Sequence, residues 1–458
     1  MITILVKKLR LKSRVPNKLD ARVSTIIFVF VLFVFLISPV LQLADSNYSM
    51  LLSQSILHHR SFTLDNYMLP RLTPTQQLFY VSNGDLYQLE LIDNHIYYFW
   101  PPGSSILSIP FVALMNAFGI SASNPDGSYN PKREIRIQAV LAALLMALLA
   151  CIFYFTSRLI LPWEWSALLA LSGALGTQLW STASRALWSE TWGIFLLGFV
   201  LFMLVAQEIG RYSIRPALLA SLLAWTYFVR PTFCVPIIAI TIYILLYYRR
   251  LFATYAAVGA AWLAVFVIYS WYHFHQLLPN YYFVYQHFRT DTLSIAFLGN
   301  IISPSRGLLV FVPILFFIAY LLMRYWAHLP LPRLVVLSLI IVVSHLVIVS
   351  SHSPWYGGHS YGPRYSTGIV PWLYLIAVLA VQGWRKSNEG QALKRPVFRR
   401  RVEGFLGGVL LLLSVTINAL GATSQATSLW NIKPVNVDQQ PERVWDWRHP
   451  QFLATWDS

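Results

Sequence analysis

Long apolar runs separated by shorter polar segments dominate the chain. A helix needs about 20 apolar residues to cross a bilayer, so each run of that length predicts one membrane helix. The pattern predicts an all-α polytopic membrane protein with about 11–13 transmembrane helices. The runs lie at residues 22–43, 103–120, 135–157, 163–180, 186–206, 214–229, 231–248, 254–273, 306–324, 333–351, 366–383 and 403–422.

The polar segments suggest three parts of the chain. Residues 1–21 form a basic N-terminal segment, expected in the cytoplasm, and residues 22–422 form the membrane domain. Within that domain, residues 44–102 make an outer segment too long for a simple connector. The tail, residues 423–458, is rich in Pro and Trp. We expect it outside the cell, packed on the membrane surface or on the outer loops.

Charge limits the classes of partner. Charged residues make up 11% of the chain, against about 25% in a soluble domain. The net charge of +16 would suit nucleic acid, but the basic residues cluster beside the apolar runs, at Lys7 to Arg22 and Arg385 to Arg401. Such clusters are typical of cytoplasmic loops and of contact with anionic membrane lipids. No nucleic-acid partner is expected, because no soluble domain is large enough to carry a basic binding surface.

The run at 103–120 conflicts with a simple count of crossings. Counting forward from the basic N-terminus places 44–102 outside. Counting back from the basic residues at Arg385 to Arg401 places 121–134 outside as well. We therefore expect 103–120 to be a re-entrant or interfacial helix, since backbone can enter and return where protein covers its polar groups.

Asp45 is the first charge after the first apolar run. Leu51, Leu52 and Ile56 fall on one face of a following helix, and an Asp just before it could cap its N-terminus. The local sequence favours that capping role. A carboxylate in this position could also act as a catalytic base, and both roles stay open at this point.

The order of several motifs resembles the integral-membrane glycosyltransferases of the GT-C class, which include protein mannosyltransferases and lipid A aminoarabinose transferases. An outer Asp after the first span is followed by an interfacial helix and then by the Pro-Pro motif of YYFWPPGSSILSIPFVALMNAFG, residues 97–119. The resemblance covers most of the chain. Its later motifs, similar to a bacterial branch of such transferases, are LGTQLWSTASRALWSE (175–190), FVRPT (228–232), ISPSRGLLVFVP (302–313) and WYGGHSYGPRY (355–365).

The resemblance implies a donor sugar carried on a polyprenyl phosphate, transferred with inversion at the anomeric carbon. It also implies that Asp45 is the general base that takes the acceptor's proton. Members of the class often carry a second acidic residue beside the first, whereas Ser46 follows Asp45 here. Four acids in the same outer segment could assist, although ordinary loop solvation is preferred for each: Asp65, Asp85, Glu90 and Asp93.

A polyprenyl phosphate leaving group needs cationic or N–H donors to hold its charge. Arg364 in GPRY is the first choice, and His359 and Tyr361 are neighbouring donors. Arg306 is a further candidate, for which reaching out to lipid headgroups is an equally good explanation.

Two charged residues inside apolar runs have alternative explanations. For Arg185, contact with lipid headgroups is favoured over phosphate binding. Glu190 is a functional candidate as an acid within a membrane helix, and an internal ion pair with an arginine is an equal alternative.

No metal-binding spacing such as HExxH or a Cys/His cluster is present. Some members of the class use a divalent cation, but nothing in this sequence specifies one. We assign no metal ligand.

These observations predict a membrane glycosyltransferase acting on the extracytoplasmic face of a bacterial inner or plasma membrane. Its partners would be a polyprenyl-phosphate-linked sugar and a lipid, glycan or protein acceptor. The alternative is a transporter or flippase for lipid-linked sugars. Transporters tend to show repeated halves and charged residues at the membrane midplane, and neither is clear here.

Overall fold

The computed structural model describes residues 17–42, 44–70, 72, 87–284, 289–389 and 397–455. Seven helices in this part of the chain are long and apolar enough to cross a membrane, so the protein is an all-α polytopic membrane protein, as the sequence predicts. These helices are α1 (Lys18–Ile37), α4 (Pro131–Arg158), α6 (Ser189–Glu208), α9 (Arg249–Phe274), α14 (Pro332–Ser350), α15 (Val370–Glu389) and α16 (Val397–Thr423).

Shorter helices fill the spaces between the long ones. They are α2 (Ser49–His59), α3 (Gly103–Ala117), α5 (Trp163–Leu175), α7 (Pro216–Val229), α8 (Cys234–Tyr247), α10 (Tyr281–Val284), α11 (Leu293–Ile302), α12 (Leu308–Phe311), α13 (Ile314–Arg324) and α17 (Gln425–Leu429). A single two-stranded sheet in the described residues consists of β1 (Leu89–Ile92) and β2 (His95–Tyr98).

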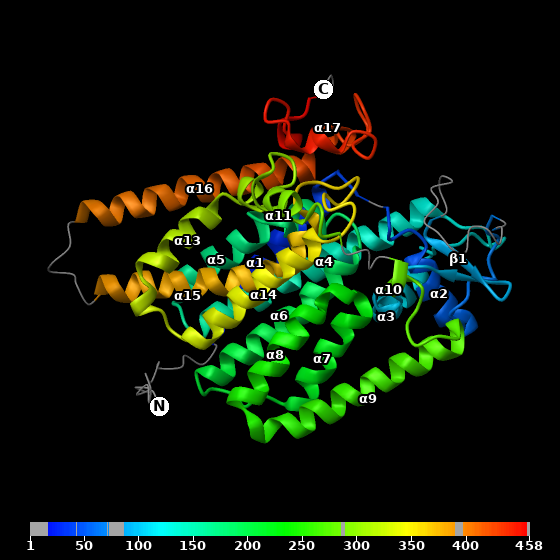
Figure 1. Cartoon of the computed structure of the whole chain (residues 1–458), viewed down its shortest axis with the longest axis horizontal. Coiled ribbons are helices and arrows are strands. Elements are labelled where there is room, and N and C mark those ends of the chain that lie inside the picture. Colours follow the sequence, from blue (N-terminus) through cyan, green and yellow to red (C-terminus); the bar gives the residue numbers. More distant parts are fainter. Residues whose placement is uncertain are drawn as a thin grey trace.

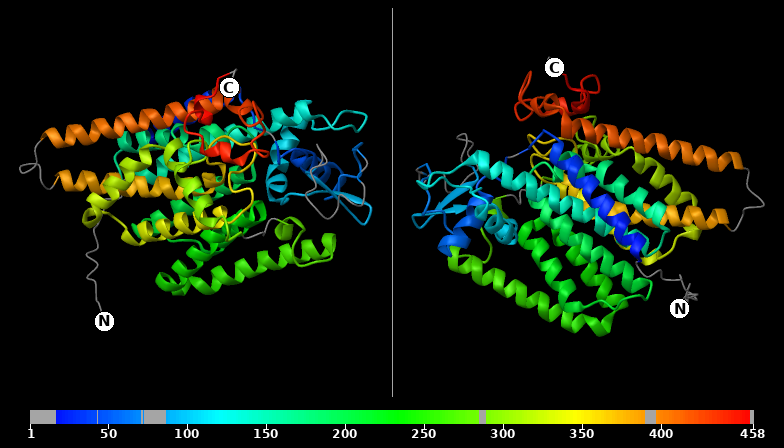
Figure 2. Two further views of the ribbon diagram at one scale, coloured as in Figure 1. Left: turned by 45° about the horizontal axis from the view of Figure 1, so that its top comes forward. Right: turned by 180° about the vertical axis from the view of Figure 1, so that it is seen from behind.

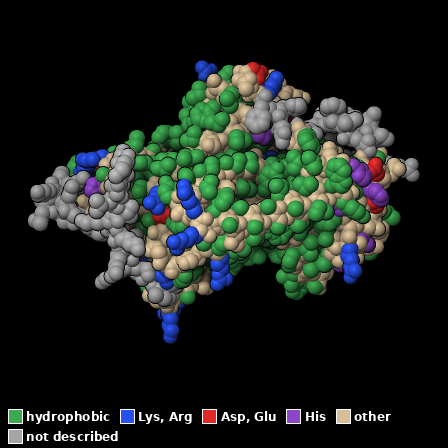
Figure 3. All heavy atoms as spheres, turned by 60° about the horizontal axis from the view of Figure 1, so that its bottom comes forward, with side chains coloured by type: hydrophobic (Ala, Val, Ile, Leu, Met, Phe, Trp, Pro, Cys, Tyr) green, Lys and Arg blue, Asp and Glu red, His purple; other side chains and the backbone are tan. Residues whose placement is uncertain are grey.

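The long helices lie side by side and leave two distinct ends (Figures 1 and 2). The β-hairpin, α2 and α3 lie at one end, which we call the hairpin end. The link between α15 and α16 lies at the other, which we call the basic end because Arg249, Arg324 and Arg333 are at its helix termini. Figure 3 shows apolar side chains over the helices, with His and acidic side chains gathered at the right of the view.

Helices α1 and α4 are tied together at the basic end. A capping box formed by Asn17 and Asp20 begins α1. The same Asp20 carboxylate, fully buried, accepts from Tyr154 Oη at 2.7 Å and from Arg158 Nε at 2.5 Å. Because a buried acid without partners would be costly, this cluster fixes where the two helices meet.

The predicted span at 103–120 is too short to cross the bilayer. Helix α3 has 15 residues, which corresponds to about 22 Å of helix, against a hydrocarbon core of about 30 Å. It lies against α2 at the hairpin end (Figure 1). Its length supports the expectation that this run does not span the membrane.

Two other predicted runs are interrupted. The run 306–324 breaks at Pro313 into α12 and α13. Helix α7 ends at Val229, Arg230 is extended with φ −159°, and a 3-10 turn at Pro231–Phe233 leads into α8. Glu208 at the end of α6 accepts from Tyr248 near the end of α8 at 2.6 Å, so α8 returns to the basic end. Helices α7 and α8 therefore form a tight hairpin at Arg230 rather than one broken helix.

The C-terminal tail packs on the loops that contain Ser303 and Tyr356. Ser303 Oγ donates to the Val444 carbonyl at 2.5 Å, and Tyr356, Trp430 and Val444 are among the residues of a separate small apolar core. This confirms, for residues up to 455, the expectation that the tail covers the loops.

Candidate functional site

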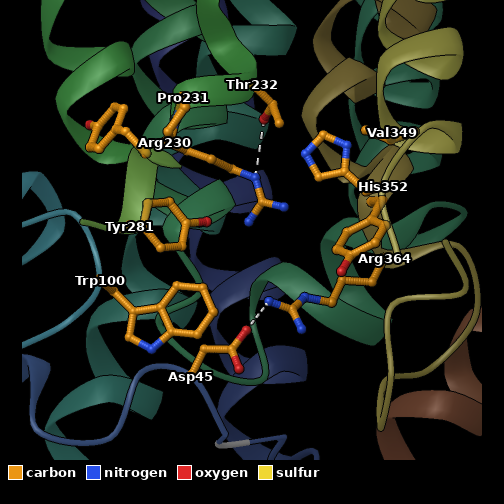
Figure 4. Close-up of a pocket in the computed structure, with 11 residues that line it drawn as sticks. Asp45, Trp100, Arg230, Pro231, Thr232, Tyr281, Val349, His352 and Arg364 are labelled. Carbon is orange, nitrogen blue, oxygen red and sulfur yellow. Dashed lines mark hydrogen bonds and ion pairs between the residues drawn. The ribbon is translucent and has the colours of Figure 1, made fainter. Parts of the chain in front are cut away.

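A cavity at the hairpin end collects side chains from distant parts of the chain (Figure 4). The connection after α1, the start of α3, the α7–α8 turn, α10, the end of α14 and the segment before α15 all contribute. Its lining consists of Asp45, Trp100, Arg230, Pro231, Thr232, Tyr281, Tyr282, Val349, His352, Arg364 and Tyr365. We call it the cationic cavity, after its two arginines.

Asp45 and Arg364 form an ion pair in this cavity. Arg364 Nη2 donates to Asp45 Oδ2 at 2.5 Å, and the two side chains are 8% and 19% exposed respectively. Tyr87 Oη donates to the other oxygen, Asp45 Oδ1, at 3.2 Å. Asp45 and Arg364, which the sequence motifs single out separately, therefore line one cavity. Both carboxylate oxygens of Asp45 are engaged in this state.

Asp45 does not cap helix α2. The helix begins at Ser49, and its N-cap residue, Tyr48, makes no side-chain cap. Instead, Glu134 of α4 accepts from the backbone N–H groups of Tyr48 at 3.0 Å and Met50 at 2.7 Å. A carboxylate from another helix thus fills the role expected of Asp45, and the capping interpretation was wrong.

The hairpin fixes the backbone at Asp45. Gln88 Nε2 donates to the Ala44 carbonyl at 2.9 Å, and Tyr98 Oη donates to the Asp45 carbonyl at 2.8 Å. Asp93 and Asn94 have φ of 50° and 62°, as a tight two-residue hairpin turn requires. This hairpin was not expected, although its alternating LELIDNHIYY pattern with a central Asp-Asn carried the signal.

A second acid lies behind the arginines. Glu190, 2% exposed, has its Oε1 at 2.9 Å from Arg230 Nη1 and 3.8 Å from Arg364 Nε. Arg230 also donates to Ser189 Oγ at 2.9 Å and to Thr232 Oγ1 at 3.1 Å. Glu190 therefore joins two arginines, which confirms the ion-pair alternative for it, although with partners other than Arg185.

The cluster is balanced in charge. Two carboxylates, Asp45 and Glu190, face two guanidinium groups, Arg230 and Arg364. Both guanidinium groups point to the middle of the cavity in Figure 4. Burial lowers the pKa of His352, which favours its neutral form. The positive charge of the cavity therefore comes from the two arginines.

Aromatic rings support this cluster. The Arg364 guanidinium carbon lies 3.6 Å from the centre of the Trp188 ring, a cation–π contact that also restricts where the guanidinium can move. Trp100 and Tyr281 lie with ring centres 4.9 Å apart on the opposite wall.

A second cavity lies on the other side of the Asp45–Arg364 pair, since both residues line it too. Three polar atoms of its lining, Ser46 Oγ, Ser104 Oγ and Trp188 Nε1, are buried and have no hydrogen-bond partner among the described residues. The remaining lining residues are Ser49, Tyr98, Trp100, Pro101, Leu187 and Ser189. We call it the serine-lined cavity.

An apolar groove lies between helices on either side of the Arg230–Pro231 turn. Helices α7, α8 and α9 line it through residues that include Tyr227, Phe228 and Cys234. These flank the Arg230–Pro231 turn of the cavity in the sequence. Helix α9 is only 11% buried in its apolar window, so this wall of the groove borders the lipid.

The assisting acids of the outer segment lie elsewhere. Asp65 accepts from His95 Nδ1 at 2.7 Å, and Asp93 lies 2.9 Å from His275 Nε2. Glu90 Oε2 accepts from Asn280 Nδ2 at 2.9 Å, and burial raises the pKa of Glu90 to about 7. None of the three lines either cavity, and Asp85 lies outside the described residues.

Arg306 is also outside the cavities. It is 1% exposed, and it donates to the carbonyls of Tyr356 at 2.8 Å and Gly358 at 3.2 Å and to Gln451 Oε1 at 2.5 Å. Its guanidinium is thus used to join the loops to the tail. Neither phosphate binding nor contact with lipid headgroups is supported for it.

Two neighbours of Arg364 are likewise used elsewhere. Tyr361 Oη donates to the Ile417 carbonyl at 2.6 Å, and the residue is 1% exposed. His359 Nε2 lies 2.8 Å from Asn436 Oδ1 and 3.3 Å from Asp438 Oδ2 in the tail. Neither side chain lines the cationic cavity, so neither is placed to hold a phosphate there.

Arg185 does not reach lipid headgroups. It is 1% exposed and donates to the carbonyls of Phe35 at 2.5 Å and Ser38 at 2.8 Å. It therefore closes the C-terminal end of α1 just before Asp45, and the headgroup interpretation was wrong.

Comparison with known proteins leaves the family open. The chain matches no protein-family model and no curated protein. The resemblance to GT-C glycosyltransferases stays a prediction from motifs. Within the described residues, no group of three or more His, Cys, Asp or Glu could hold a metal ion.

Proposed function

We propose that the protein is a membrane glycosyltransferase that moves a sugar from a polyprenyl-phosphate donor to a hydroxyl on an envelope acceptor. The observation that supports it best is one cavity that holds an acid, Asp45, together with two arginines, Arg230 and Arg364. A base and an anion-binding pair are the two groups that such a transfer needs.

In the proposed reaction, the acceptor oxygen attacks the anomeric carbon of the donor sugar. Asp45 takes the proton of the acceptor hydroxyl as the new carbon–oxygen bond forms. The bond between the anomeric carbon and the phosphate oxygen breaks, and its electron pair leaves with the phosphate. Arg230 and Arg364 hold the negative charge of that phosphate. One displacement of this kind inverts the anomeric centre.

The donor's lipid tail would lie in the groove between α7, α8 and α9. This groove is lined mainly by apolar side chains, and Phe228 of its lining lies two residues before Arg230 of the cationic cavity, so we infer that a tail in it brings the phosphate to the arginines. The donor could then enter sideways from the bilayer without leaving it. We place the hairpin end on the extracytoplasmic face of a bacterial inner or plasma membrane, because the Arg-rich helix termini lie at the opposite end.

The proposal is tested by transfer from a panel of radiolabelled polyprenyl-phosphate sugars in membranes that contain the wild type or Asp45→Asn. We expect transfer by the wild type and a loss of about 100-fold or more in the variant, the usual contribution of a general base. Asn keeps the size of Asp but cannot take a proton. Equal transfer by two equally abundant proteins would remove Asp45 from the mechanism. No transfer from any donor would favour a transporter for lipid-linked sugars.

A further inference from the structure

The Asp45–Arg364 ion pair blocks both of the roles just proposed. Each oxygen of Asp45 already accepts a hydrogen bond, from Arg364 Nη2 at 2.5 Å and from Tyr87 Oη at 3.2 Å. A carboxylate held this way is a poor acceptor for a substrate proton. Arg364, in turn, has its Nη2 occupied by a carboxylate where a phosphate oxygen would bind. The site must rearrange before it can act.

We propose that the phosphate of the donor displaces Asp45 from Arg364, and that the freed carboxylate turns to the serine-lined cavity, where the acceptor's hydroxyl binds. The inference rests on the proposed function. It makes donor binding the step that releases the base, so that the donor binds before the acceptor reacts.

The exchange leaves both arginines paired with an anion. A phosphate oxygen replaces a carboxylate oxygen on the same guanidinium. Glu190 stays 3.8 Å from Arg364 Nε and 2.9 Å from Arg230 Nη1, and the Trp188 ring still covers the Arg364 guanidinium at 3.6 Å. Glu190 is thus a positioning residue: it keeps both arginines in the cavity when Asp45 lets go.

The movement needed is confined to one side chain. The backbone on both sides of Asp45 is held, because Gln88 and Tyr98 donate to the Ala44 and Asp45 carbonyls. Asp45 is the more exposed partner, at 19% against 8% for Arg364. Since Asp45 lines both cavities, rotation of its carboxylate is enough to change the cavity it faces.

The serine-lined cavity needs a ligand that makes hydrogen bonds. Ser46 is 3% exposed, Ser104 6% and Trp188 1%, yet one polar atom of each has no partner among the described residues. A buried polar group left unpaired is destabilising, so these atoms favour a ligand that can form hydrogen bonds with them. An acceptor hydroxyl whose proton points to Asp45 can accept hydrogen bonds from a serine O–H and from the Trp188 N–H.

The test measures binding of a polyprenyl monophosphate to full-length protein in nanodiscs. Four proteins are compared: the wild type, Asp45→Asn, Glu190→Gln and Asp93→Asn. If Asp45 competes with phosphate for Arg364, Asp45→Asn binds about tenfold more tightly, which is a difference of about 1.4 kcal/mol. Glu190→Gln also removes one negative charge from the cluster, but Glu190 does not compete with phosphate for Arg364 Nη2. This variant should therefore show no tighter binding. Asp93→Asn, at an exposed site on the hairpin, is unchanged.

The outcomes separate the two proposals. No binding by the wild type overturns the proposed function itself. Binding that is equal or weaker in Asp45→Asn overturns the displacement and leaves the proposed function standing. An equal gain in Asp45→Asn and Glu190→Gln also overturns it, because a simple change in net charge then explains the result.

A structure of the wild type with bound polyprenyl monophosphate keeps the proposal testable if Asp45→Asn fails to fold. We expect Asp45 and Arg364 to lie farther apart than the ~4 Å of an ion pair, with a phosphate oxygen on Arg364. An intact Asp45–Arg364 pair beside the bound phosphate would overturn the displacement.

Discussion

At the scale of single residues, the role of a side chain depends on contacts with residues far away in the sequence, which the local sequence pattern does not reveal. Asp45 stands where a cap is expected, but Glu134, from a helix almost 90 positions later, accepts the N–H groups of Tyr48 and Met50. The ion-pair partner of Asp45 is Arg364, which lies 319 positions later in the chain. Only the fold could decide between the two roles that the sequence left open.

The motifs identified part of the candidate site. The motifs predict a role for Asp45 and for Arg364, and these two residues lie together. They assign no role to Arg230, which belongs to the FVRPT motif. An arginine just before a proline inside an apolar run was the available signal, because a charge there needs a buried partner. Arg306, at the start of another apolar run, is buried too but contacts Tyr356 and Gln451, so burial of an arginine alone does not indicate which function it serves.

Glu90 gives a prediction on pH. Burial raises its pKa from 4.5 to about 7, so between these values the folded protein binds its proton more tightly than the unfolded chain does. Stability must then fall as pH rises through that window. We expect Glu90→Gln to remove this loss, with a gain over wild type that grows to as much as about 3 kcal/mol by pH 8. Thermal unfolding in detergent between pH 5 and 8 measures it.

The control for Glu90 is Glu442→Gln, which changes an exposed carboxylate of the tail. It should follow the wild type at every pH. A constant difference between Glu90→Gln and wild type across the range would show that Glu90 does not titrate there.

At the scale of elements, the positions of the apolar runs were predicted well and their interruptions were not. Pro313 splits one run, as expected of a residue without an N–H. Helix α3 has only 15 residues. This agrees with the count of membrane crossings, which predicts that the run at 103–120 does not span the bilayer. The β-hairpin is short and has no helical period, so its signal is only the Asp-Asn turn between two alternating segments of four residues.

The groove between α7, α8 and α9 gives a prediction with a matched control. A side chain added at Gly259 meets open space, as does one at Gly408 in a separate apolar hollow between α13, α15 and α16. Gly259→Leu should fill the groove and weaken binding of a polyprenyl monophosphate by about tenfold or more. Gly408→Leu should fold equally well and bind normally. The reverse pattern would move the lipid tail to the other hollow.

At the scale of the whole molecule, the sequence predicts a helical bundle because each segment in lipid must pair its own backbone groups. It does not predict which helices meet. Neighbours such as α1 and α4 are chosen by particular contacts, here the Asp20–Arg158 pair, and by the shapes of packed side chains. The place of the site, at the hairpin end, follows from that packing.

The orientation of the bundle is tested by labelling. In a variant whose Cys151 and Cys234 are replaced by Ala, a single cysteine is placed at Asp93 or at Arg399, exposed positions at opposite ends. A membrane-impermeant maleimide should label Asp93→Cys in intact cells. It should label Arg399→Cys only after the membrane is opened. Labelling in the opposite order would place the cationic cavity in the cytoplasm.

The distance of 319 positions between Asp45 and Arg364 has a consequence for biogenesis. A ribosome delivers the acid to the membrane surface while most of the bundle is still unmade, and its cation arrives only when the penultimate long helix inserts. A chain truncated before Arg364 would carry an unbalanced acid and no complete anion site. Assembly of the cationic cavity is therefore a late event of membrane insertion, completed only after nearly the whole chain has been inserted.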